Sequence, residues 1–200
     1  MRGGAAASIG CIASLMVGCA PSLQQQAVEV ELQPVCCSSP DAFDYVPLEV
    51  GASATLKFEQ GVQVFDFGDG KSYVRGVRLG AGTGRWLEIR SSLTLANPGN
   101  QYFHPAVTFY DERFIRISSF ESRLAPRLES PSLEIYEAGD VQVPQTAMYA
   151  VFWTSRQVME HWSREVPSLA KRMIVTEPIY IPAYTGSLDV KLKILFGAGG

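Results

Sequence analysis

The sequence predicts a mainly β protein, a β-sandwich of the jelly-roll type with one or two short helices near its C-terminal third. Several short segments alternate apolar and polar residues at the period of a β-strand. Turn residues such as glycine, proline and asparagine separate these segments at close spacing, which is typical of sandwiches and barrels. An immunoglobulin-like sandwich is the alternative, because composition does not distinguish the two topologies.

The chain begins with the features of a secretory signal peptide over residues 1–18. Arg2 precedes an apolar run that is too short to cross a bilayer as a helix, which takes roughly 20 apolar residues. Gly18 stands before Cys19, so cleavage there would leave this cysteine as an N-terminus for lipid attachment. Lipoprotein signals prefer leucine where Met16 stands, and plain secretion without lipid is the alternative.

Residues 19–42 are predicted to be a lipidated N-terminus followed by a flexible tether. Ser22 to Gln26 is mostly polar and lies between two prolines, and such a stretch cannot bury enough apolar surface to fold alone. Ala20 rather than aspartate follows Cys19, which favours the outer membrane. We therefore expect a periplasmic protein that acyl chains such as palmitate anchor to the outer membrane.

Cys36 and Cys37 would be the two cysteines left in the exported domain. In an oxidising compartment they can form a vicinal disulfide, and the alternatives are that they stay reduced or pair elsewhere. The sequence holds two histidines, too few to complete a soft-metal site with these thiols. We expect no metal and no cofactor.

Residues 43–196 are predicted to form the sandwich domain. Asp69 and Gly70 would make a tight turn between the first two strands. The segment ending at Trp153 is apolar on both faces, which indicates a central strand and a packing role for that tryptophan. In residues 86–95, Leu87, Ile89 and Leu93 would share one face of a strand, and Arg90 and Ser92 the other. The predicted strands are residues 62–67, 72–79, 86–95, 106–110, 114–120, 132–136, 147–154, 179–184 and 188–195.

One helix is expected to interrupt the strands. Thr154 and Gln157 have the spacing of a capping box, and an apolar stripe that includes Met159 follows at helical period. Pro167 would end this helix, and Ser168 could cap a second short one through Met173. The apolar stripe is expected to pack against a sheet.

Composition and motifs exclude several classes of function. The formal net charge is −3 and lysines and arginines form no run, so we expect no nucleic-acid partner. The glycines after residue 68 match neither a phosphate-binding loop nor a dinucleotide-binding fingerprint. No nucleophile can be assigned to His104 or His161, and the carboxylates Glu129, Glu134 and Glu137 are expected on solvated faces. The prediction is that the protein is not an enzyme.

Several short motifs, in order and spacing, resemble the MalM family of maltose-operon periplasmic proteins, especially its shorter lipoprotein members. The resemblance covers roughly residues 35 to 193. It is carried by residues 36–39 (CCSS), 44–48 (DYVPL), 64–67 (VFDF), 70–73 (GKSY), 87–91 (LEIRS), 103–107 (FHPAV), 110–111 (YD), 149–154 (YAVFWT) and 186–193 (GSLDVKLK).

The resemblance implies a non-enzymatic envelope protein that is accessory to carbohydrate transport, usually of maltose or maltodextrins. It implies an oligosaccharide or an envelope transport protein as partner, besides the membrane. Saccharides stack on aromatic faces, so the candidate contact residues are Trp86, Tyr102, Tyr110 and Tyr184. The alternative is a structural or protein-interaction module of the envelope without a sugar site.

Overall fold

The structure is a computed structural model that describes residues 21–94, 100–121, 124–129, 134–161, 164 and 180–194. Residues 156–161 are helical. The other elements, in chain order, are α1 (Leu23–Leu32), the 3-10 turn η1 (Pro40–Ala42), β1 (Tyr45–Leu48), β2 (Ser53–Phe58), β3 (Val64–Asp66), β4 (Lys71–Tyr73), β5 (Arg75–Leu79), β6 (Arg85–Thr94), β7 (Asn100–Phe103), β8 (Ala106–Tyr110), β9 (Arg116–Glu121), β10 (Ala125–Glu129), β11 (Glu134–Gln142), β12 (Tyr149–Trp153), β13 (Tyr180–Ala183) and β14 (Gly186–Ile194).

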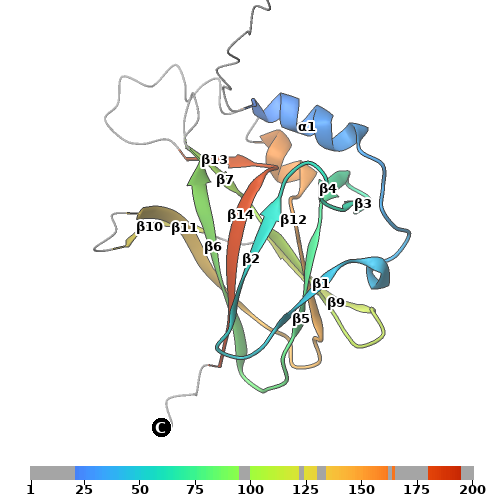
Figure 1. Cartoon of the computed structure of the whole chain (residues 1–200), viewed down its shortest axis with the longest axis vertical. Helices are drawn as coiled ribbons and strands as arrows, with labels where there is room; N and C mark the ends of the chain where they lie inside the picture. Colours follow the sequence, from blue (N-terminus) through green and yellow to red (C-terminus); the bar gives the residue numbers. More distant parts are fainter. Residues whose placement is uncertain are drawn as a thin grey trace, which may run out of the picture.

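Most strands belong to two sheets that face each other (Figure 1). The first sheet has the strand order β1-β5-β12-β8-β9, and the second has the order β10-β11-β6-β14-β2. At one end, β7 pairs with both β6 and β13. Strands β3 and β4 form a separate hairpin. The prediction of a mainly β sandwich is confirmed.

The strand order identifies the sandwich as a jelly roll. Eight strands, β2, β5, β6, β8, β9, β11, β12 and β14, form two antiparallel groups with the orders β11-β6-β14-β2 and β5-β12-β8-β9. The first three of these eight alternate between the sheets, whereas an immunoglobulin-like sandwich keeps its first two strands in one sheet. The alternation followed by the β8–β9 hairpin is the double Greek key of a jelly roll.

The core lies between the two sheets. On β6, Leu87 and Ile89 are fully buried and alternate with half-buried Trp86 and Arg90, so one face of this strand points inward and the other outward. Phe58 and Phe103 stack inside the core with their ring centroids 3.8 Å apart. This alternation confirms the predicted faces of β6.

The first sheet is covered on its outer face as well. The β3–β4 hairpin and the segment before β1 lie over it and bring a second apolar cluster against Val151 of β12. Trp153 stacks on Phe67 of this cover, with ring centroids 4.1 Å apart, and its Nε1 donates to Thr108 Oγ1 at 3.0 Å. The prediction that β12 is a central strand and that Trp153 serves packing is therefore confirmed.

The N-terminal segment is a helix where a flexible tether was expected, which corrects the prediction for residues 23–32. Ser22 and Gln25 form a capping box, and Leu23 and Val30 join the main core cluster. The polar residue Gln26 is buried because both ends of its amide are hydrogen-bonded. The stretch thus folds by packing on the body of the protein rather than alone, and α1 lies across one end of the sandwich (Figure 1).

The helix at residues 156–161 begins differently from the predicted capping box. The helix starts at residue 156, so Ser155 rather than Thr154 directly precedes it, and the Ser155 carbonyl accepts from Met159 N–H. The Thr154 hydroxyl donates to the His104 carbonyl at 3.1 Å. Met159 is fully buried, as the apolar stripe predicts. Pro167, and the second helix predicted from Ser168 to Met173, lie outside the described residues.

Several strands differ from their predicted bounds. The predicted strand 72–79 is divided between β4 and β5, because Val74 N–H bonds to the Gln63 carbonyl between them. Strands β1, β2, β7 and β10 lie outside the strands predicted from the sequence. In the part of the chain that the structure describes, no helix combines the length and hydropathy needed to cross a membrane.

Candidate functional site

A cleft of about 640 Å³ opens between the two sheets along one flank of the sandwich. It lies between the edge strand β9 of the first sheet and β11 of the second. Strand β10 pairs only with residues 134–138 of β11, so residues 139–142 have β6 on one side and no described strand on the other. The cleft opens where this pairing stops.

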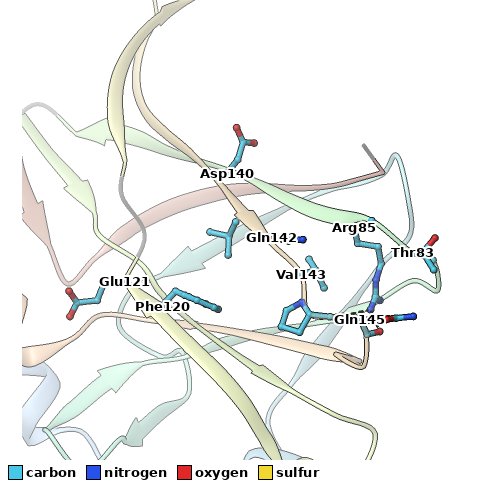
Figure 2. Close-up of a pocket in the computed structure, with 12 residues that line it drawn as sticks. Thr83, Arg85, Phe120, Glu121, Asp140, Gln142, Val143 and Gln145 are labelled. Carbon is cyan, nitrogen blue, oxygen red and sulfur yellow. Dashed lines mark hydrogen bonds between the residues drawn. The ribbon is translucent and has the colours of Figure 1, made fainter. Parts of the chain in front are cut away.

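An exposed aromatic ring forms one wall of the cleft. Phe120 of β9 retains 46% of its surface exposed and touches the core through Phe109, at 6.2 Å between ring centroids. Its ring points toward the end of β11 and the segment that follows it, which carry Gln142 and Val143 (Figure 2). The carboxyl groups of Glu121 and Asp140 point outward at the rim of the cleft (Figure 2).

Arg85 forms hydrogen bonds with the backbone of two loops at the far end of the cleft, one after β5 and one after β11. Its side chain is buried, and Nη1 donates to the Gly80 carbonyl at 2.8 Å. Nη2 donates to the carbonyls of Ala147 at 2.8 Å, Gln145 at 3.0 Å and Pro144 at 3.3 Å. Burial lowers the pKa of the Arg85 guanidinium. Its Nε has no hydrogen-bond partner in the structure, which leaves one buried donor unused beside the cleft.

The cleft therefore combines an apolar wall with side chains that donate hydrogen bonds and side chains that accept them. Phe120, Val141 and Val143 supply apolar surface, and the amide side chains of Gln142 and Gln145 can donate and accept. Two rim carboxylates, from Glu121 and Asp140, accept only. A polyhydroxyl ligand with one apolar face needs this combination of surfaces.

Trp86 lies next to this cleft. It is half-buried on the outer face of the second sheet and pairs in register with Gln142, whose side chain lines the cleft. Paired side chains on neighbouring strands lie about 5 Å apart at their Cβ atoms. Trp86 can therefore extend the apolar surface of the cleft onto the outer face of the sheet.

The three tyrosines predicted to contact sugar do not lie at this cleft, which corrects that prediction. Tyr102, Tyr110 and Tyr184 are each more than nine-tenths buried. Burial raises the pKa of each phenol. Tyr110 belongs to the apolar cluster over the first sheet, and Tyr184 donates its N–H to Gln26. Tyr184 also lines a smaller pocket, of about 210 Å³, between α1 and the helix at residues 156–161.

Glu137 is also placed differently from its prediction as a solvated carboxylate. It lies on the inward face of β11, opposite Ser91 of β6, and is 3% exposed. Burial raises the pKa of the Glu137 carboxyl. For the His104 imidazole, burial has the opposite effect and lowers the pKa. The side chains of Glu129 and Glu134 lie outside the described residues, so no acidic pair can be assigned.

Cys36 and Cys37 are joined by a disulfide bond, one of the arrangements that the sequence left open. Cys37 packs against the apolar cluster over the first sheet, and Cys36 N–H bonds to the Val64 carbonyl of β3 at 2.8 Å. The bridge thus lies in the cover of that sheet. No group of three or more potential metal ligands occurs within the described ranges.

Sequence reasoning did not identify Phe120, Asp140, Gln142 or Gln145 as site residues. The one available signal was Phe120 itself, an aromatic residue that follows two serines at the end of the predicted strand 114–120. Cys19 lies outside the described residues. No protein-family model matches the chain, and a search of the curated proteins found no match.

Proposed function

We propose that the protein is a non-enzymatic lipoprotein of the cell envelope that binds carbohydrate in the cleft between β9 and β11. The observation that supports this most strongly is the exposed ring of Phe120 in a cleft that also presents amide and carboxylate side chains. The proposal keeps the maltodextrin class that the MalM resemblance implies. The protein would act beside a transport system rather than transform its ligand.

The chemistry of a sugar ring fits the two kinds of surface. The C–H face of a pyranose stacks on an aromatic ring, and its hydroxyls bond to amides and carboxylates at the periphery. Gln142 and Gln145 supply such amides, and Glu121 and Asp140 supply carboxylates. A cleft of about 640 Å³ lies within the range of small-molecule sites, roughly 300–1,000 Å³. Jelly rolls also serve as lectin domains, which is an analogy of fold alone.

The envelope location depends on Cys19. Acylation of this residue after removal of residues 1–18 would anchor the domain stably, since two or more acyl chains hold a protein on a bilayer. Cys19→Ala should abolish acyl labelling and release the protein from the membrane fraction. Unchanged membrane retention of that variant would contradict the anchor.

Calorimetric titration with maltodextrins tests the carbohydrate site, on a soluble form that starts after Cys19 and therefore keeps α1. The wild type should give saturable heat, and Phe120→Ala should lose it. Ile117→Ala is the matched control, because Ile117 is partly exposed on the same strand and does not line the cleft. Equal heats for the two variants would refute the cleft as the binding site.

The second candidate is a protein-interaction module, and the edge strand β9 favours it. Ile115 and Ile117 are exposed at this edge, which has no described strand on its outer side. An extended peptide could add to such an edge. Silence with sugars, together with capture of one envelope protein that is lost on Ile117→Lys, would favour this alternative.

A further inference from the structure

Helix α1 presents an apolar surface on the side that faces away from the protein. Leu23, Gln26 and Val30 face the body of the protein and are buried. Val28 and Leu32 are 58% and 78% exposed, and residues four apart lie on one face of a helix. Leu32 therefore points away from the protein, and Val28 is exposed beside it at the rim of a small pocket that Arg156 and Tyr184 also line.

The attachment of α1 is rigid, because three of the four hydrogen bonds of Gln26 link it to two other segments. Gln26 Nε2 donates to Gln101 Oε1 at 2.9 Å and to the Pro21 carbonyl at 3.0 Å. Its Oε1 accepts from Tyr184 N–H at 3.0 Å and from the Thr185 hydroxyl at 3.4 Å. The outward face of α1 thus has a fixed orientation relative to the sandwich.

The proposed acylation site lies very near this helix. Cys19 precedes Leu23, the first residue of α1, by four positions. A chain spans at most about 3.6 Å per residue, so these positions are separated by no more than about 14 Å. The helix itself is about 15 Å long. A lipid on Cys19 therefore holds α1 within one helix length of the bilayer.

Charged side chains lie beside the outward face, and the exposed carboxylate of Glu29 is among them. Lys71 Nζ donates to the carbonyls of Glu31 and Gln33 at the end of α1, at 2.8 and 2.9 Å. Arg156 lies 3.8 Å from the Glu31 carboxylate and 2.9 Å from that of Glu160. Lysine and arginine side chains at the edge of an apolar face suit the headgroup layer of a membrane.

From these observations we propose that the outward face of α1, with Val28 and Leu32 at its centre, rests on the surface of a phospholipid bilayer. The inference rests on the proposed lipid anchor at Cys19. Two side chains alone would bind a membrane weakly, but the anchor makes their contact intramolecular and raises its effective concentration. The domain then has one orientation on the membrane, with α1 toward the lipid and the β8–β9 loop on the far side (Figure 1).

The test places a nitroxide on a cysteine introduced by Leu32→Cys, in acylated full-length product reconstituted into phosphatidylcholine vesicles. The disulfide between Cys36 and Cys37 and the acyl group on Cys19 leave the new thiol as the site of labelling. Val28→Cys is a second label on the same face. Ile115→Cys is the matched control, since Ile115 is 59% exposed and lies in the β8–β9 loop.

On vesicles, the labels at residues 28 and 32 should lose collisions with a water-soluble nickel complex and gain collisions with oxygen, whereas the label at 115 should change little. Equal nickel accessibility at 32 and 115 in acylated, vesicle-bound protein would overturn the docking of α1 while leaving the anchor intact. Mass spectrometry of the same product separates the two proposals, because a Cys19 without acyl groups would refute both.

Discussion

Two regions of the sandwich differ in how fully their buried polar groups are hydrogen-bonded. One is the end that α1 covers, and the other is the flank between β9 and β11. At the covered end, both atoms of the Gln26 amide are bonded, to Gln101 and Tyr184 among others. On the open flank, Arg85 Nε is buried without a partner and Phe120 remains exposed. A sealed end contributes stability, whereas a flank with unused donors and an exposed ring retains capacity for a ligand.

The largest expected effect on stability comes from Arg85, although it lies on the open flank. Arg85→Leu should lower the free energy of unfolding by roughly 3–5 kcal/mol, because each buried carbonyl left without a donor costs about 1–3 kcal/mol. Chemical denaturation measures this loss. Arg78→Leu, an exposed arginine on β5, is the control and should change stability by about 0.5 kcal/mol or less. Similar losses in both variants would show that the bonds of Arg85 are not structural.

The second largest loss of stability is expected at the end of the sandwich that α1 covers. Gln26→Leu should destabilise the protein by about 2–3 kcal/mol, because Gln101 and the Tyr184 N–H would lose buried partners. The exposed Gln24 offers the same substitution on the same helix as a control. Thermal unfolding compares the two, and an unchanged Gln26→Leu variant would mean that α1 does not seal this end.

A smaller effect, which depends on pH, is expected from Glu137 on β11. Burial raises its pKa above the unfolded value of 4.5, so its contribution to stability is present below that value and is lost as pH rises through the folded pKa. Glu137→Gln should therefore raise the melting temperature at pH 7 and change it little at pH 4. A shift of the same size at both values would contradict a buried, titrating carboxyl.

The smallest effect on stability is expected at Phe120. Because the ring is 46% exposed, Phe120→Ala should cost about 1 kcal/mol or less. The same substitution should abolish carbohydrate binding, so function and stability separate at this residue. Melting temperatures measured beside the titrations check this, and a large drop in melting temperature would place Phe120 in the core instead.

The sequence supports the fold more fully than the site. Strand β8 has its predicted bounds, residues 106–110, and β6 shows its predicted inward and outward faces, because alternation is a local property. The choice of a jelly roll over an immunoglobulin-like sandwich depends on which strands pair, and no local pattern encodes that. Helix α1 was missed although Ser22 and Gln25 have capping-box spacing, because so short a polar segment needs the partners that bury Gln26.

The candidate site could not be predicted for the same physical reason. Phe120 lies in a predicted strand, but its neighbours across the cleft belong to the part of β11 beyond residue 136, where no strand was predicted. Trp86 was predicted as a contact and lies beside the cleft through its pairing with Gln142. The tyrosines failed as candidates because aromatic residues in a sandwich are more often buried than exposed, and sequence spacing does not separate the two.

The most direct test of the carbohydrate site is a nuclear magnetic resonance titration with maltotriose of the ¹⁵N-labelled soluble form that starts after Cys19. The proposed cleft predicts saturable shifts at the amides of Phe120, Gln142 and Gln145, with Trp86 Nε1 shifting for longer oligosaccharides. Shifts confined to other surfaces, or none at millimolar sugar, would contradict a carbohydrate site between β9 and β11.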